Sequence, residues 1–273
     1  MEAKKPYIIA EIGSNWRVYD DKEKNKVAIG HQIRQVRCAG ADAVKFQYVT
    51  SKELYGKQIP RLDKYHLYED ILVHSAKLAE IQAIDFMCTA FSKEGYQFVD
   101  EFVKIHKVAS CEATDLDMID YVISLDKAVI ISTGGLDNSQ IDTLIDRYPE
   151  DQITLMDCVI DYPARPDQYD LSILTDIQAK GIKVGLSDHT TSYVTAIAAQ
   201  HLGATIFEKH VNFDWVKDSP DASTSIDRTD FEIYCSVIRN KTHGRMKKIS
   251  SRESSNVRDH QRRQLEHGFY RPI

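Results

Sequence analysis

The stretch KVGLSDHTTSYVTAIAAQHLGATIFEKH, residues 183–210, decides the fold of this chain. Two short apolar runs, at residues 183–186 and 205–208, are typical of buried strands. Between them, residues 195–202 carry apolar side chains at three- and four-residue spacing, which predicts a helix. A strand, a helix and a second strand in this order form one unit of a parallel sheet.

The same alternation continues through the rest of the chain. Eight strand-like runs lie at residues 7–12, 43–46, 85–88, 103–108, 128–132, 153–156, 183–186 and 205–208. Eight such units in about 250 residues favour the α/β class, as a (β/α)8 TIM barrel, over an open doubly wound sheet. A Rossmann fold would also need a GxGxxG turn after its first strand, where this chain has EIGSN at residues 11–15.

The composition describes an ordinary globular protein. The 273 residues are 42% hydrophobic and 28% charged, which is enough apolar material for one sizeable core. We predict a catalytic barrel at residues 1–240 and a polar extension at residues 241–273, where charge and serine dominate. The stretch at residues 49–71 is too long for an ordinary connection and is a candidate lid.

Charge and cysteine content exclude several classes of protein. The net charge of -6 gives no general attraction to nucleic acid or to an anionic membrane. The apolar run near the N-terminus is too short for a signal peptide or a membrane span, so we expect a cytoplasmic protein. The five scattered cysteines, odd in number and without CxxC spacing, indicate reduced thiols.

Polar residues of catalytic type follow almost every predicted strand. In this class of barrel, chemistry takes place where the carboxyl ends of the strands enter their loops. The residues at these places are Glu11, Lys45, Gln47, Thr89, Lys107, Ser110, Ser132, Tyr162, Ser187, Asp188, His189, Glu208, Lys209 and His210.

Two of these residues, Lys45 and Lys107, lie within apolar runs. A buried ammonium group without an anionic partner is costly, so each lysine needs a carboxylate or a phosphate nearby. A bound anionic substrate is one solution, and pairing with Glu11 or Glu208 is the structural alternative. Hydroxyls of Ser110, Ser132 and Ser187, with the backbone amides of residues 133–135, suit a phosphate at the same end of the barrel.

His189 and His210 end two neighbouring strands, so both imidazoles can reach one point above the barrel rim. Two histidines with oxygen ligands suit a catalytic metal with open positions, and they favour Mn, Mg, Co or Fe over structural zinc. A pair of hydrogen-bonded histidines without a metal is the alternative.

Seven segments together resemble the catalytic barrel of the N-acetylneuraminate (sialic acid) synthase family, the NeuB-like proteins. They are YIIAEIGSN at 7–15, GADAVKFQ at 40–47, KVAS at 107–110, IISTGG at 130–135, DYPA at 161–164, GLSDHT at 185–190 and GATIFEKHVNFD at 203–214. The resemblance covers roughly residues 7–235. It implies condensation of phosphoenolpyruvate with the aldehyde of an aldose or acylamino-sugar, such as N-acetylmannosamine, to give a 2-keto-3-deoxy sugar acid and phosphate.

The resemblance also implies roles for individual residues. His189 and His210 correspond to ligands of a divalent metal, with Mn2+ expected first and Mg2+ or Co2+ as alternatives. Lys45, Lys107, Ser110, Ser132 and Ser187 correspond to the phosphoenolpyruvate cradle. Glu11, Gln47, Tyr162 and Asp221 would face the sugar, with Glu11 as the group that moves a proton. Glu208 completes the expected substrate-binding set.

The chain departs from the family pattern at several places. Trp16 replaces a usual histidine, Ile160 replaces a common asparagine, and Ala222 replaces a usual histidine after Asp221. Family members usually continue into a small antifreeze-like domain, and residues 261–265 resemble the linker to it. We therefore expect either that this domain is absent, by nature or by truncation, or that a separate antifreeze-like protein supplies it. The family further implies a homodimer.

Two other functions remain open from the sequence. A metal-dependent aldolase acting on a related 2-keto acid would use similar cations. A non-catalytic barrel subunit that docks on another synthase component would explain the departures at Trp16, Ile160 and Ala222. Such a subunit would not need both lysines, both histidines and the serines.

Overall fold

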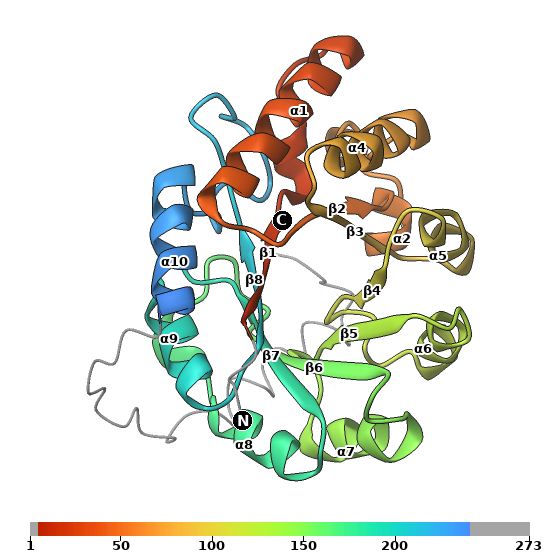
Figure 1. Cartoon of the computed structure of the whole chain (residues 1–273). Helices are drawn as coiled ribbons and strands as arrows, with labels where there is room; N and C mark the ends of the chain where they lie inside the picture. Colours follow the sequence, from red (N-terminus) through yellow and green to blue (C-terminus); the bar gives the residue numbers. More distant parts are fainter. Residues whose placement is uncertain (1–4, 241–273) are drawn as a thin grey trace.

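The computed structural model describes residues 5–240, and it has eight parallel strands that alternate with helices around one barrel (Figure 1). The strands are β1 Tyr7–Glu11, β2 Ala43–Tyr48, β3 Asp85–Ala90, β4 Ile105–Val108, β5 Ala128–Ser132, β6 Ile153–Cys158, β7 Lys183–Asp188 and β8 Ile206–His210. Each predicted apolar run overlaps one strand. The expected (β/α)8 barrel is confirmed, while the predicted extension at residues 241–273 lies outside the described residues.

Helices cover the outside of the strands. They are α1 Lys22–Ala39, α2 Ser51–Tyr55, α3 Pro60–Asp63, α4 Glu69–Ile81, α5 Lys93–Asp100, α6 Leu116–Ile123, α7 Asn138–Arg147, α8 Ser172–Ala179, α9 Val194–His201 and α10 Arg228–Asn240, with 3-10 turns η1 Gly13–Trp16 and η2 Pro166–Gln168. Local signals set their ends. In α1, the Asp21 side chain accepts a hydrogen bond from the Lys24 amide, and Gly40 ends the helix at a φ of 110°.

The strands are hydrogen-bonded in the order β3-β2-β1-β8-β7-β6-β5-β4, and β3 lies beside β4 to complete the ring. The register aligns Glu11 with both Lys45 and His210, and Ser187 with Glu208. Polar residues from different strands are therefore brought to the same level of the barrel, at the carboxyl ends of the strands.

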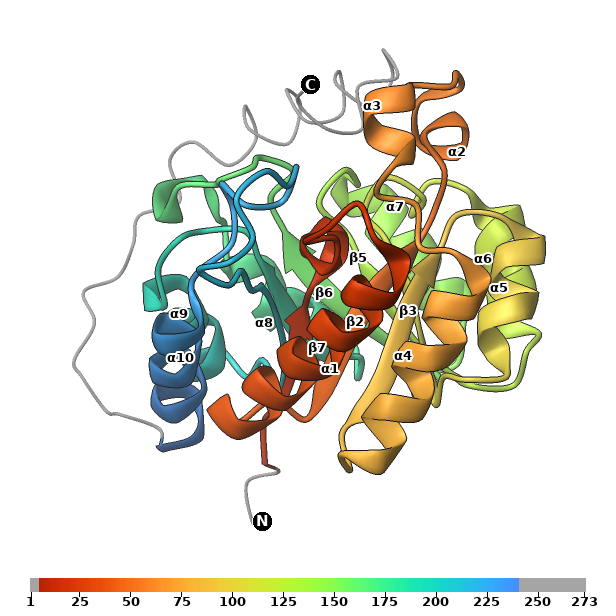
Figure 2. The same cartoon turned by 90° about the horizontal axis from the view of Figure 1, so that it is seen from above.

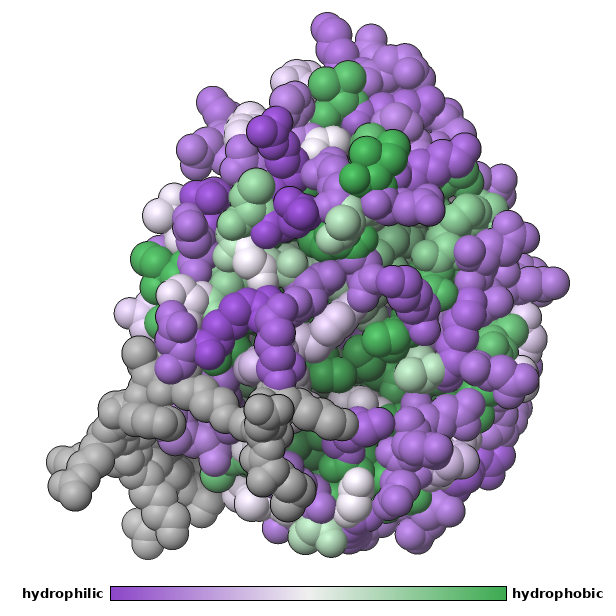
Figure 3. Space-filling model, in the orientation of Figure 1, coloured by the Kyte–Doolittle hydropathy of each residue, from purple (hydrophilic) through white to green (hydrophobic). Residues whose placement is uncertain are grey.

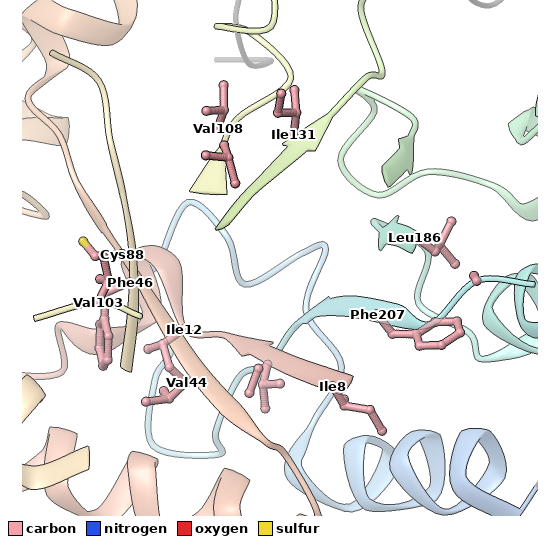
Figure 4. Close-up of a cluster of buried hydrophobic side chains, with 14 of the residues drawn as sticks. Ile8, Ile12, Val44, Phe46, Cys88, Val103, Val108, Ile131, Leu186 and Phe207 are labelled. Atoms are coloured by element: carbon pink, nitrogen blue, oxygen red, sulfur yellow. The ribbon is translucent and has the colours of Figure 1, made fainter. Parts of the chain in front are cut away.

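Alternation along each strand separates two cores. Outward residues such as Ile8, Val44 and Phe207 belong to a large cluster between the strands and the helices, part of which is shown in Figure 4. Inward residues form a smaller cluster inside the barrel, made of Ile9, Ala43, Met87, Ile130 and Met156. Because side chains alternate with period two, the next inward residues after this cluster are polar ones.

The long stretch after β2 contains α2 and α3, which project beyond the rest of the barrel at one end (Figure 2). We call residues 49–66 the insertion. It is fastened by its own side chains, since Ser51 Oγ accepts from the Ile59 amide at 2.6 Å and Asp63 accepts from the Ser51 amide at 3.0 Å. On the face shown in Figure 3, hydrophilic residues dominate the outer ring and hydrophobic residues are seen mainly toward the middle.

Within residues 5–240, none of the helices combines the length and the apolar character that crossing a membrane requires.

Replacing Phe207 by alanine tests the outer core. Phe207 is 0% exposed, so Phe207→Ala should lower the free energy of unfolding by about 3–5 kcal/mol, because it removes buried apolar surface and leaves a cavity. Ile81→Ala is the control, since Ile81 is 77% exposed, and it should change stability by less than about 0.5 kcal/mol. Equal losses in urea denaturation would contradict this description of the core.

Candidate active site

A buried ion cluster lies inside the carboxyl end of the barrel. Lys45 Nζ lies 2.8 Å from Glu11 Oε2 and 3.6 Å from Glu208 Oε2, and it donates to Thr89 Oγ1 at 3.2 Å. Gln47 Nε2 donates to the other oxygen of Glu11 at 2.6 Å. Glu11, Lys45 and Glu208 are all buried. The structural alternative raised from the sequence, pairing of a lysine with these two glutamates, is therefore correct for Lys45.

Burial and neighbouring charges shift the pKa values of Glu11 and Glu208 in opposite directions. Burial raises the pKa of Glu11 to about 7, with a further contribution from Glu208, although Lys45 works against it. Burial also acts to raise the pKa of Glu208, but Lys107, Lys45 and the two rim histidines outweigh it and lower this pKa. Glu11 is thus the carboxyl group that can take up and release a proton near neutral pH.

Lys107 differs from Lys45 in its partners. Its Nζ donates to Ser132 Oγ at 2.7 Å and to the Val108 carbonyl at 3.0 Å. Among residues 5–240, no carboxylate lies within ion-pair distance of this ammonium, and burial lowers the pKa of Lys107. A buried cation held only by neutral oxygens has room for an anionic ligand.

Two of the predicted serines extend this region. Ser110 Oγ accepts from the Gly134 amide at 3.3 Å, and Ser187 Oγ donates to Glu208 Oε1 at 3.4 Å. With Ser132, three hydroxyls therefore line the same hollow as Lys107. Such hydroxyls and amides are suitable donors to a phosphate or a carboxylate.

The two histidines lie at the rim beside Tyr162. The ring centroids of His189 and His210 are 5.6 Å apart, and the Tyr162 ring lies 4.3 Å from His189 and 6.2 Å from His210. His189 Nδ1 lies 2.6 Å from the Val159 carbonyl, which can only accept, so Nδ1 carries the proton and the lone pair is on Nε2.

These histidines fit a metal in an open site. A carbonyl that fixes the tautomer of an imidazole is the usual support of a metal-ligating histidine. In the part of the chain that the structure describes, no group of three or more His, Cys, Asp or Glu side chains is arranged to hold a metal ion. A metal held here would have the two imidazoles as its protein ligands, one fewer than the three of a typical catalytic zinc site, and it would need more oxygen ligands from water or substrate.

Asp221 reaches the barrel from the loop after β8. Its Oδ2 accepts from the Ser14 amide and from Ser14 Oγ, both at 2.7 Å. Gly13, at a φ of 51°, allows this approach, because a Cβ there would lie 2.4 Å from Asp221 Oδ2 and 3.1 Å from Glu11 Oε1. The close packing at Gly13 thus places the carboxyl groups of Glu11 and Asp221 on either side of one turn.

Two adjoining hollows contain these residues. A deep one of about 50 Å3 is lined by both lysines, both histidines, the three serines and Glu208. A wider one of about 550 Å3 is lined by Ser14, Asp221 and residues of the insertion, including Tyr65 and His66. Gln47 and Tyr162 line both. All twelve residues predicted for the site therefore line one of the two hollows or, in the case of Glu11, pair with a residue that does.

The three departures from the family pattern have different surroundings. Trp16 is buried, and within residues 5–240 it lines neither hollow; its Nε1 donates to the Tyr65 carbonyl at 3.0 Å and fastens the insertion. Ile160 does line the deep hollow. The Ala222 amide donates to the Ser219 carbonyl at 3.1 Å, in the loop that carries Asp221.

Some residues of the site were not predicted as such. Ser14 was missed, although it follows the first predicted strand by two residues, because its contact with Asp221 joins positions 207 residues apart. Cys158 was predicted only as one of the reduced thiols, but it lines the deep hollow, with Sγ 3.9 Å from His189 Nδ1. Its place two residues after a predicted strand was the available signal.

The fold and the site together define a (β/α)8 barrel with a charged pocket at the carboxyl ends of its strands. The model of the NeuB family matches residues 32–249, and the chain belongs to this family.

Several relatives are named as synthases, among them N,N'-diacetyllegionaminic acid and pseudaminic acid synthases. The chain is 28% identical to the N,N'-diacetyllegionaminic acid synthase of Campylobacter jejuni, over 93% of this chain and 82% of that protein. It is 31% identical to the spore coat polysaccharide biosynthesis protein SpsE of Bacillus subtilis, over 80% of this chain and 62% of that protein. Among solved structures, the N-acetylneuraminic acid (sialic acid) synthetase of Leptospira borgpetersenii superposes with a TM-score of 0.80, at 22% identity, covering 93% of this chain and 91% of the other.

Removal of Lys45 should destabilise the barrel more at high pH than at low pH. In Lys45→Met the pKa of Glu11 loses the lowering effect of the ammonium, so it rises further above that of the unfolded chain. A carboxyl group with a raised folded-state pKa costs stability as the pH rises through that value. The melting temperature should therefore fall further below wild type at pH 8.5 than at pH 6. If the melting temperature of Lys45→Met were lower than that of wild type by the same amount at both pH values, the coupling of Lys45 to Glu11 would be contradicted.

Proposed function

We propose that this protein condenses phosphoenolpyruvate with the aldehyde of a sugar, forming a carbon-carbon bond and releasing inorganic phosphate. The observation that carries the proposal is the buried ammonium of Lys107, held by a hydroxyl and a carbonyl, next to the Lys45 ion cluster and below two histidines. The named synthases among the relatives support the same class of reaction.

The deep hollow is the proposed site of phosphoenolpyruvate. Lys107 would pair with one of its anionic groups, and Ser110, Ser132 and Ser187 would donate hydrogen bonds to phosphate or carboxylate oxygens. An anion there would also restore the lowered pKa of Lys107, because an opposite charge favours the protonated amine. Lys45 would remain shared between the substrate and Glu11.

The wider hollow is the proposed site of the acceptor sugar. Gln47 and Tyr162 line both hollows, so they would contact the sugar next to its aldehyde. Asp221, with Ser14, would bind sugar hydroxyl or amide groups. The acceptor class is an aldose or an acylamino-sugar such as N-acetylmannosamine. The insertion would limit the entry of water, since Trp16 and the contact of Tyr65 Oη with the Asp218 carbonyl hold it over the cavity.

In the proposed reaction, C3 of phosphoenolpyruvate attacks the aldehyde carbon, and the aldehyde oxygen gains a proton. Water adds at C2 and loses one proton. The C2–O bond to phosphate then breaks while the new C2 hydroxyl gives its proton to the departing phosphate, which leaves the keto group. Glu11 is the proposed group for one of these proton transfers, because its pKa lies near neutrality. Gln47 would orient the Glu11 carboxyl group through its 2.6 Å hydrogen bond.

His189 and His210 are the proposed ligands of a divalent metal, with Mn2+ the first candidate and Mg2+ or Co2+ next. When bound, such a metal would supply polarisation of the aldehyde carbonyl. The Val159 carbonyl would keep the lone pair of His189 on Nε2. We further propose a cytoplasmic homodimer, on the basis of the family alone.

Phosphate release tests this proposal. Wild-type protein with Mn2+ and phosphoenolpyruvate should release phosphate only when a suitable sugar is added, in a screen of N-acetylmannosamine, diacetamido-sugars and simple aldoses. His189→Ala should lose at least about 100-fold in rate, because a proposed metal ligand is removed. His31→Ala, an exposed histidine on α1, is the control and should match wild type. Release of phosphate without any sugar, or none with every sugar, would contradict the proposal.

The pH profile tests the role of Glu11. If Glu11 accepts a proton as a carboxylate, kcat/KM should fall as the pH drops below about 7, where this group becomes protonated. Glu11→Gln should lower the rate by about 10²–10⁴-fold and abolish this acidic limb. Glu23→Gln, at an exposed position of α1, should keep the wild-type profile. An unchanged limb in Glu11→Gln would exclude this role.

A further inference from the structure

A second buried ion pair lies on the opposite side of the strands that carry the histidines. Asp188 and Lys209 are register partners on β7 and β8, and both are 0% exposed. Lys209 Nζ lies 3.0 Å from Asp188 Oδ2. Since side chains alternate along a strand, this pair points toward the helices, while the adjacent His189 and His210 point into the barrel.

The pair is tied to the loop that follows β7. Asp188 Oδ1 accepts from the amide of Thr190 at 2.9 Å and from its hydroxyl at 2.8 Å. Lys209 Nζ donates to the Thr190 carbonyl and, at 3.1 Å, to the Ser192 carbonyl, and it lies 5.4 Å from the ring centroid of Tyr234 on α10. The Lys209 ammonium, on β8, thus holds the loop after β7 through the carbonyls on both sides of Thr191.

His189 lies between Asp188 and the captured Thr190. Its amide donates to Tyr169 Oη at 2.9 Å, and its carbonyl accepts from the Ala164 amide and from Thr224 Oγ1, both at 3.0 Å. The ring is oriented by the Val159 carbonyl. Hydrogen bonds therefore hold both the backbone and the ring of His189, next to the Thr190 that Asp188 and Lys209 hold.

Stability alone does not account for a charged pair in this place. One step earlier on the same strands, the outward positions hold Leu186 and Phe207, which pack in the apolar core. Replacing a buried ion pair by apolar residues of similar volume is often neutral or stabilising. What apolar side chains cannot provide is the set of directed bonds to Thr190 and Ser192.

We propose that Lys209 and Asp188 are positioning residues that hold His189 and His210 in the geometry that binds the divalent metal. The inference rests on the proposed function, because it assigns these histidines to the metal. The pair touches neither substrate nor metal and acts through the backbone of residues 188–192 and the strand position next to His210.

Manganese binding by the purified chain, followed by the electron paramagnetic resonance of free Mn2+, tests this inference without relying on turnover. Lys209→Met should weaken Mn2+ binding by about 10–100-fold, the usual effect of losing a group that orients a ligand. In kinetic assays kcat should fall, while KM for phosphoenolpyruvate should stay within about twofold, because Lys45 and Lys107 are unchanged.

Two further variants separate positioning from stability. The apolar pair Asp188→Leu/Lys209→Met removes both charges, so it should recover stability relative to Lys209→Met while Mn2+ binding stays weak. Leu144→Ala, at a buried position of α7, should lower the melting temperature but keep wild-type Mn2+ affinity. Mn2+ affinity that recovers together with stability in the apolar pair would overturn the inference.

The proposed function can fail independently. If the wild-type protein binds Mn2+ but releases no phosphate with any sugar, the proposed synthase function is wrong. The Mn2+ affinities of the variants would still decide whether Asp188 and Lys209 position the histidines. A wild-type protein that binds no Mn2+ would overturn the metal assignment and this inference with it.

Discussion

The rest of the site depends on the ammonium group of Lys45, which is buried between the carboxylates of Glu11 and Glu208. Removing three charges from water is costly, and only close mutual contacts offset the cost. The closed sheet supplies these contacts, because its register brings β1, β2 and β8 to one level. Burial raises the pKa of Glu11 although Lys45 acts against it, whereas at Glu208 the effect of burial is outweighed by Lys107 and Lys45, which lower the pKa. Two chemically identical groups thus differ in how readily they take up a proton.

Side chains on the two faces of the barrel strands have different functions. Outward residues such as Phe207 bury apolar surface against the helices, and inward ones carry the ions and hydroxyls. Asp188 and Lys209 are an exception, since they are charged residues on the outward side. Their place beside the two histidines connects the packing of the outer layer with the geometry of the pocket.

Much of the fold follows from the sequence because apolar runs and their spacing are local signals. All eight strands were predicted in this way, and residues at strand ends such as Lys107 and His210 were found because barrel chemistry occurs there. The pairing of Lys45 with Glu11 was expected only as the alternative to a bound anion, and the contact of Ser14 with Asp221 and the use of Trp16 to fasten the insertion were not predicted. Each depends on the closing of long loops, which no local pattern records.

We propose above all that the deep hollow, next to the two histidines, binds phosphoenolpyruvate through the buried Lys45 and Lys107. Titration calorimetry of phosphoenolpyruvate into wild type, Lys107→Met and Lys104→Met tests it most directly; Lys104 is an exposed lysine near the start of β4. We expect binding to weaken at least about 10-fold in Lys107→Met, since a charge-assisted bond is lost, and to be unchanged in Lys104→Met. Equal affinity in all three proteins would contradict it.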